Sequence, residues 1–259
     1  MIIRLFLRFD GTDYNGWQLQ NINGEENPAL KTVQGTLNRA LRTLLRDDNI
    51  AVVGSSRTDA GVHAAEYCAS FETEKTIVPP DKIAAAVAHL LPEDIVVYRS
   101  EQAPEGFNAR FDTKSKTYRY FFYTGAFSVP LLDRNFWHVP VREALDISLM
   151  NEAAGFIMGT HDFSAFCGSG ASNKTAVRTV SNLRVESIGS MWDSELYAAS
   201  ITGDGFLYNM VRIITGTLIM AGTGKIKPSD LETIIGSRDR RMAGITAPPQ
   251  GLHLWRVEY

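Results

Sequence analysis

The sequence predicts an α+β protein with a mostly antiparallel sheet. Two observations lead to this fold class. Runs of β-branched or alternating apolar residues, which are typical of strands, are interspersed with segments of helical apolar period. The two kinds of segment do not follow the strict strand–helix–strand order of a doubly wound parallel sheet. The prediction is therefore a mixed fold built on antiparallel strands.

The first half supplies the clearest elements. A strand is predicted at residues 1–10, followed by a turn at 11–18 in which Tyr14 and Trp17 are expected to be core anchors. Thr32 is placed to cap a helix that ends near Arg46. The remaining predicted elements are strands at 50–53, 62–71 and 94–99 and a helix at 80–91.

A polar stretch at residues 101–112 is expected to join the two halves. The second half is predicted to contain a strand at 114–123, a helix at 141–158, a loop of small residues at 168–174, strands at 176–188 and 195–202 separated by a turn around Gly189 and Ser190, a buried helix at 205–220, and a last alternating strand before residue 259.

Composition excludes several classes of protein. The chain of 259 residues is 44% hydrophobic and 21% charged, which is ordinary for a globular protein, and it has neither a low-complexity tract nor a repeat. Its length fits one large domain or two of moderate size. The formal net charge of -3 means that any contact with nucleic acid must come from a local basic face.

Targeting and metal signals are weak. Arg4 and Arg8 interrupt the apolar core that a signal peptide would need, and no window approaches the roughly 18 uncharged apolar residues of a membrane span. We therefore expect a soluble, cytoplasmic protein with no membrane partner. Cys68 and Cys167 lack the spacing of a zinc site or disulfide framework, and no nucleotide-binding motif occurs, so we expect no metal and no cofactor.

Residues 54–64 combine turn residues, a cation and a carboxylate between two apolar runs, and we interpret them as a catalytic loop. Asp59 can bond its own downstream backbone, and Gly61 can take a positive φ. The alternative is that Asp59 only holds the turn, with Arg57 as its solvated partner.

Two further stretches carry candidate residues. Cations alternate with aromatic residues at 114–123, around Tyr118, an arrangement that can hold unstacked RNA bases beside phosphates but also occurs in ordinary sheets. Arg212 lies on the helix predicted to be buried, where a guanidinium needs a partner. Asp59 is one candidate partner; another acid or backbone carbonyl groups are the alternative.

Residues 57–64, R-T-D-A-G-V-H-A, resemble the signature of the tRNA pseudouridine synthases of the TruA type. The resemblance extends along the whole chain, through G-T-x-Y-x-G-W-Q at 11–18, F-x-A-R-F at 107–111, D-F-S-A-F at 162–166, F-x-x-x-x-V-R-x-x-x-G at 206–216 and A-P-x-x-G-L-x-L-x-x-V-x-Y at 247–259. The sequence departs from the family at Asn108, where the family has His, and at Ser55 and Ser56, where Gly or Ala is usual.

The resemblance implies a fold of two mixed halves, with largely antiparallel sheets flanking a positively lined cleft. Residues 1–108 would carry the Asp loop, and residues 109–259 the base-packing Tyr and the Arg helix. It further implies a homodimer that converts uridine to pseudouridine in the anticodon stem-loop of tRNA, at positions 38–40.

Site roles also follow from the resemblance. Asp59 would be the nucleophile, Arg212 its counter-ion, Tyr118 the group that packs on the target base and Arg57 the cation that holds the base flipped out. Arg110 and Phe163 would be further substrate-binding residues.

Two other functions compete with this one. A non-catalytic tRNA-binding module could present the same basic and aromatic face. A hydrolase that cuts the glycosidic bond would need a second carboxylate for acid catalysis, and no motif supplies one.

Overall fold

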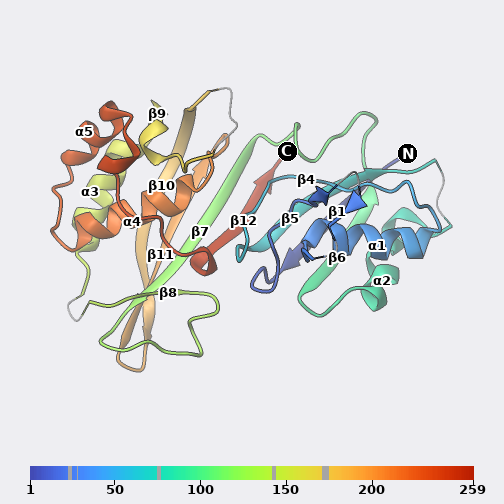
Figure 1. Ribbon diagram of the computed structural model, residues 1–259, viewed down its shortest axis with the longest axis horizontal. Coiled ribbons are helices and arrows are strands. Elements are labelled where there is room, and N and C mark those ends of the chain that lie inside the picture. The colour runs from blue at the N-terminus through green and yellow to red at the C-terminus, as the bar shows by residue number, and fades with distance from the viewer. Residues whose placement is uncertain (23–24, 28, 75–76, 142–143, 171–174) are drawn as a thin grey trace. The chain divides into compact units, whose positions relative to one another are not determined.

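The computed structural model describes residues 1–22, 25–27, 29–74, 77–141, 144–170 and 175–259 (Figure 1). The chain forms two compact units: residues 1–114 with 254–259, called here the first unit, and residues 115–253, the second unit. Both contain sheet strands and helices. Among the pairings whose register the structure describes, the strands run antiparallel except where β8 runs parallel to β7. The predicted α+β class with a mostly antiparallel sheet is confirmed.

The first unit is organised on strands in the order β6-β1-β5-β12, with β4 paired to β5. Its strands are β1 Ile2–Phe9, β4 Val53–Gly54, β5 His63–Glu72, β6 Ile95–Gln102 and β12 Leu252–Glu258, of which residues 254–258 belong to this unit, and a small ribbon pairs β2 Asn21–Ile22 with β3 Glu25–Glu26. Its helices are α1 Val33–Leu45 and α2 Ile83–Val87, with 3-10 turns at Pro80–Lys82 and Ala88–Leu90.

Helix α1 begins and ends as the sequence predicts. The Thr32 hydroxyl accepts a hydrogen bond from the backbone N–H of Gly35, and Arg46 ends the helix in the left-handed region, with φ 54. The predicted strand at 50–53 is wrong for its first three residues. Their polar groups bond to α1 instead: the N–H of Val52 donates to Asn38, and the side chain of Gln34 donates to the carbonyl group of Val52.

The second unit has strands in the order β7-β11-β10-β9. Its strands are β7 Ser115–Thr124, β8 Trp137–Val139, β9 Gly159–Asp162, β10 Val177–Met191 and β11 Ser194–Gly203. Its helices are α3 Ile147–Ile157, α4 Met210–Gly222 and α5 Asp230–Ser237, with 3-10 turns at Ser164–Phe166, Arg240–Met242 and Pro249–Gly251. Helix α3 packs on β10 and α4, and α4 also contacts β7 (Figure 1).

Three boundaries in the second unit differ from the prediction. Helix α3 starts at Ile147, and not at residue 141, because Asp146 caps it by accepting from the N–H of Leu149. The predicted turn at Gly189 is a bulge in β10, and the hairpin turns instead at Trp192, which has φ 54. Helix α4 starts at Met210, because Asn209 before it is left-handed, with φ 60. Residues 171–174 of the predicted small-residue loop lie outside the described residues.

The C-terminal strand belongs mostly with the first unit. The division between the units falls after Lys114, a little beyond the predicted boundary at 108/109, and residues 254–259 lie with the first unit although the prediction grouped them with 109–259. The physical reason is the bonding of the two segments: the N–H of Lys114 donates to the carbonyl of Glu258, and the Tyr259 hydroxyl donates to the carbonyl of Ala109.

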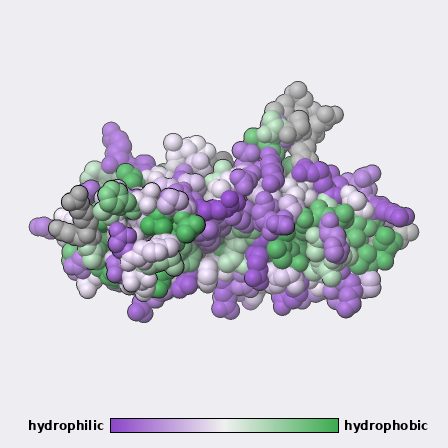
Figure 2. Space-filling view, turned by 90° about the horizontal axis from the view of Figure 1, so that it is seen from below, coloured by the Kyte–Doolittle hydropathy of each residue, from purple (hydrophilic) through white to green (hydrophobic). Residues whose placement is uncertain are grey.

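One face of the molecule carries hydrophobic patches between larger hydrophilic areas (Figure 2). Exposed large side chains include Ile188, Met191 and Trp192 along the β10–β11 hairpin. In the part of the chain that the structure describes, no helix combines the length and the apolar character needed to cross a bilayer.

Candidate active site

Asp59 lies half-buried in the loop between β4 and β5, at the first position of a tight turn. The N–H of Val62 donates to the carbonyl of Asp59 at 3.2 Å, and Gly61 takes the predicted positive φ, 76°. Ala60, the second residue, is not among the residues with positive φ, so the turn is of type II, which favours glycine at its third position. The backbone therefore forms the turn itself, through the Asp59 carbonyl group and Gly61.

The loop at residues 11–18 holds the backbone on both sides of Asp59. The N–H of Trp17 donates to the carbonyl of Thr58 at 3.0 Å, and the N–H of Gly61 donates to the carbonyl of Tyr14 at 3.3 Å. These bonds flank the carboxylate residue and leave its backbone little freedom. Precise placement of a reacting group is what a catalytic loop requires.

Two glycines allow this close approach. A Cβ on Gly11 would lie 2.0 Å from the carbonyl oxygen of Val62, and a Cβ on Gly16 would lie 2.6 Å from the carbonyl oxygen of Thr58. Gly16 also has φ +87, which disfavours any other residue. The glycines of the 11–18 motif are therefore required by the packing of this loop against the Asp59 loop.

Aromatic packing supports the start of the Asp59 loop. Trp17 stacks on Tyr67 with ring centroids 4.2 Å apart, and both rings press on Gly54, where a Cβ would lie 2.1 Å from the Tyr67 hydroxyl oxygen. That hydroxyl donates a short hydrogen bond to the carbonyl of Ser56. Tyr14 and Trp17 are both buried, so their predicted role as core anchors is confirmed.

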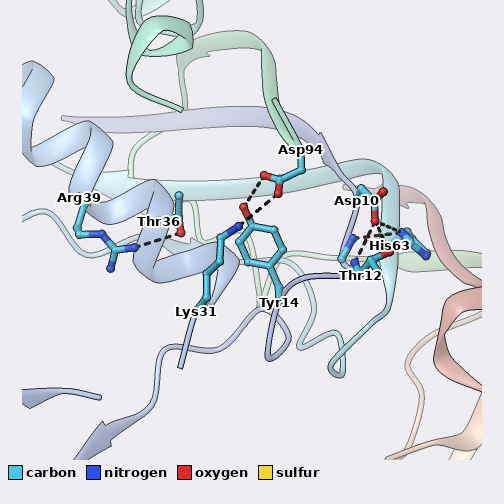
Figure 3. A network of polar contacts seen from close by, with 9 residues as sticks. Asp10, Thr12, Tyr14, Lys31, Thr36, Arg39, His63 and Asp94 are labelled. Atoms are coloured by element: carbon cyan, nitrogen blue, oxygen red, sulfur yellow. Dashed lines mark hydrogen bonds and ion pairs between the residues drawn. The ribbon is translucent and has the colours of Figure 1, made fainter. Parts of the chain in front are cut away.

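A polar network fixes the far side of the 11–18 loop (Figure 3). The Tyr14 hydroxyl donates a short hydrogen bond to Asp94, which also lies 3.4 Å from the Lys31 ammonium group. The same ammonium group lies 4.1 Å from the centre of the Tyr14 ring. Burial, and then the bond to Asp94, raise the pKa of Tyr14, so its hydroxyl keeps the proton that it donates.

His63, the last polar residue of the motif, is buried where β5 begins. Its Nδ1 accepts from the N–H of Gly11 at 3.1 Å and lies 3.1 Å from a carboxylate oxygen of Asp10. Asp10 also accepts from the N–H and the hydroxyl of Thr12 (Figure 3). His63 thus ties the end of the Asp59 loop to the start of the 11–18 loop.

The other predicted residues of the first unit are exposed. Arg57, two residues before Asp59, and Arg110, on the turn after Phe107, are both exposed residues. Exposure leaves both cations available to an anionic substrate, and their predicted substrate contacts stay predictions.

In the second unit, Tyr118 lies on β7 opposite Ile201 of β11, and only 6% of its surface is exposed. Its ring meets the Phe206 ring edge to face, with centroids 5.3 Å apart. Phe163 is fully buried beside Phe166 and His161. Phe163 therefore supports the surrounding backbone from within the core, and the substrate contacts of both residues stay predictions.

Arg212 is half-buried in the first turn of α4, a helix that is otherwise buried on nearly all sides, as predicted. Its Nε donates to the carbonyl of Ala247 and one terminal nitrogen donates to the Asn209 side chain, both at 2.7 Å. A backbone carbonyl, one of the alternatives considered from sequence, is thus among its partners. The predicted ion pair with Asp59 stays a prediction.

The spacing from Arg212 to Gly216 has a structural cause. The two residues are one helical turn apart and face the same loop, and a Cβ on Gly216 would lie 2.1 Å from the carbonyl oxygen of Ile245. The hydroxyl of Thr217 accepts from the N–H of Gly244 at 2.8 Å. The guanidinium group of Arg212 is therefore held in place by the 244–248 loop.

Sequence reasoning missed several supporting residues. Asp94 and Lys31 come from distant parts of the chain, and no local pattern links them to Tyr14. The glycines at 11 and 16 were visible as part of a motif, but only the structure shows what they pack against. Among the described residues, no group of three or more His, Cys, Asp or Glu side chains is placed to hold a metal ion.

Comparison with known proteins agrees with the resemblance found in the sequence motifs. The family model described as tRNA pseudouridine synthase matches residues 6–112 and 153–259. A Clostridium tetani protein named tRNA pseudouridine synthase A 2 is 42% identical over 257 residues, covering 99% of this chain and 98% of the relative. The tRNA pseudouridine synthase A of Acetivibrio thermocellus is 43% identical over 257 residues, covering 99% of both chains. The chain belongs to the tRNA pseudouridine synthase family.

Proposed function

We propose that this chain converts uridine to pseudouridine in the anticodon stem-loop of tRNA, at positions 38–40, with Asp59 as the nucleophile. The observation that carries the proposal is the fixed position of Asp59. Hydrogen bonds from Trp17 to Thr58 and from Gly61 to Tyr14 hold the backbone on both sides of it. A carboxylate on such a loop can be aimed at one atom of a bound nucleotide.

The reaction is an isomerisation. The N1 glycosidic bond breaks, the uracil turns, and a new bond joins C5 to the sugar; C5 loses a proton and the released N1 gains one. Asp59 would add either to C1′ of the sugar or to C6 of the uracil, and both routes form a covalent intermediate that later releases the carboxylate. No electrons are gained or lost overall.

The other residues would bind and orient the substrate. Arg57 is exposed two residues from Asp59, a suitable position for a cation that holds the flipped nucleotide. Arg212, fixed by Ala247 and Asn209, would keep the Asp59 carboxylate ionised. Tyr118 would pack on the target base, with Phe163 supporting the same unit. Arg110 would contact the tRNA backbone.

We further infer that the protein acts in the cytoplasm as a homodimer. Ile188, Met191 and Trp192 are exposed along the β10–β11 hairpin, and several exposed apolar side chains on one hairpin support contact with a second copy. Sedimentation of the purified protein tests this directly: a mass of one chain at micromolar concentration would contradict the dimer.

The test of function is to measure both product and binding. Wild type and Asp59→Ala are incubated with a tRNA transcript, and the RNA is then digested and its pseudouridine content measured by chromatography. We expect wild type to form pseudouridine at positions 38–40 and Asp59→Ala to form none while still binding tRNA. Binding without product by both proteins would instead identify a non-catalytic tRNA-binding module.

A further inference from the structure

Phe111 is an apolar side chain displayed to solvent. It is 74% exposed at the end of the turn that follows Phe107, and the guanidinium carbon of Arg110 lies 5.2 Å from the centre of its ring. A phenylalanine left in water forgoes the free energy that burial of its ring would give. Such exposure alone is not unusual, since Phe127 is 79% exposed in another loop. What distinguishes Phe111 is the turn that carries it.

The turn is capped at both ends by side chains. The Asn108 carbonyl oxygen accepts from the N–H groups of Arg110, at 2.9 Å, and Phe111, at 3.3 Å. The Asp112 carboxylate accepts from the N–H of Asn108 at 2.8 Å, and the N–H of Asp112 donates back to the carbonyl of Asn108 at 3.1 Å. These bonds also explain Asn108: an amide oxygen here fixes two successive backbone groups.

The same turn is anchored in the core of the first unit. Ala109 is fully buried; its N–H donates to the Ser70 hydroxyl on β5 at 3.1 Å, and its carbonyl accepts from the Tyr259 hydroxyl at 2.7 Å and the Thr113 hydroxyl at 2.9 Å. The exposed Phe111 ring is therefore carried by a backbone turn that hydrogen bonds fix to the core of the first unit. A side chain fixed in this way loses little conformational entropy when it binds.

We propose that Phe111 is a stacking platform for an unpaired base of tRNA, with Arg110 bound to a neighbouring phosphate; this inference rests on the proposed function. An aromatic face beside a guanidinium matches the two parts of a single-stranded nucleotide, its base and its phosphate. The loops of tRNA supply unpaired bases. A partner protein or a second copy of the chain would also cover an exposed ring, and the test separates these.

The experiment compares Phe111→Ala with Phe127→Ala, the same change at an equally exposed phenylalanine, and with Phe111→Trp. Binding of a tRNA transcript is measured by fluorescence anisotropy over a range of salt concentrations, and KM and kcat are measured by tritium release from 5-tritiated uridine. We expect Phe111→Ala to raise Kd and KM roughly tenfold with kcat nearly unchanged. Phe127→Ala should match wild type, and Phe111→Trp should restore binding.

Salt dependence distinguishes the two residues. Phe111→Ala removes no charge, so the slope of log Kd against log salt should stay that of wild type. Arg110→Ala should reduce this slope by about 1, the amount expected for the loss of one phosphate contact. Binding of tRNA by Phe111→Ala within twofold of wild type would overturn the proposal. Normal tRNA binding by Phe111→Ala together with loss of its dimer would also overturn it, and would assign Phe111 to contact with a second copy of the chain. Binding does not require catalysis, so a wild type that binds tRNA without tritium release would reject the proposed function but still test Phe111.

Discussion

Replacing Gly16 with alanine tests whether the 11–18 loop sets the position of Asp59. The new Cβ would lie 2.6 Å from the carbonyl oxygen of Thr58 and 3.1 Å from the carbonyl carbon of Asp59. Unbonded heavy atoms rest at about 3.5 Å, so the two loops must separate by most of an ångström. The hydrogen bond from Trp17 to Thr58, now 3.0 Å, would lengthen and weaken.

The expected effect is on kcat. A catalytic group misplaced by about 1 Å can cost on the order of 100-fold in rate, so we expect Gly16→Ala to lower kcat roughly 10- to 100-fold. The positive φ of +87 adds a cost of about 1 kcal/mol in folding stability. Single-turnover tritium release from 5-tritiated uridine in tRNA measures the rate, and urea unfolding measures the stability.

Gly224→Ala is the matched control. Gly224 has φ +69, so alanine there has the same kind of backbone strain, but its Cβ would meet no atom within 4 Å. It should lose about 1 kcal/mol of stability and keep the wild-type kcat. A folded Gly16→Ala protein whose kcat matches that of Gly224→Ala would refute the role given to the 11–18 loop.

Three further predictions concern stability, measured by urea unfolding. Asn38→Ala leaves the N–H of Val52 without its present acceptor and should cost about 1–3 kcal/mol; a loss below about 0.5 kcal/mol would contradict the account of residues 50–53. Gly216→Ala should cost about 1–3 kcal/mol because its Cβ would overlap the Ile245 carbonyl, whereas Gly155→Ala, in α3 with nothing within 4 Å, should be neutral or stabilising. Equal changes in unfolding free energy for the two variants would refute the close packing of Gly216 against Ile245. Burial raises the pKa of the Cys68 thiol to about 11, so the thiol ionises in the unfolded chain before it does in the folded one, and the folded state loses stability as pH rises from about 9 to about 11. The difference in unfolding free energy between wild type and Cys68→Ala should therefore narrow over that range. A difference that stays constant with pH would contradict the raised pKa.

The sequence predicted the elements whose signals are local. The Thr32 cap, the helix it starts and the positive φ of Gly61 follow from neighbouring residues, and all three are present. The predicted turn at Gly189 was wrong because its signal was not local. A glycine fits a bulge as well as a turn, and the pairing of β10 with β11 decides between them.

The candidate site was predicted only in part for a related reason. The 57–64 motif pointed to Asp59 through its resemblance to the family signature, and the catalytic role of Asp59 stays a prediction. The bonds that fix its loop come from Trp17 and Tyr14, more than forty residues earlier in the chain, and Tyr14 is fixed in turn by Asp94. Such partners are set by tertiary packing, which the pattern of a single segment does not encode.

The most direct measurement of the central claim is tritium release from tRNA transcripts that carry 5-tritiated uridine, with wild type and with Asp59→Ala. Formation of the C5 glycosidic bond must expel the hydrogen at C5, so release reports the chemical step itself. We predict release by wild type and none by Asp59→Ala, with tRNA binding retained by both. Equal release by the two proteins would contradict the assignment of Asp59 as the nucleophile. No release by either protein would contradict the claim that the chain catalyses pseudouridine formation.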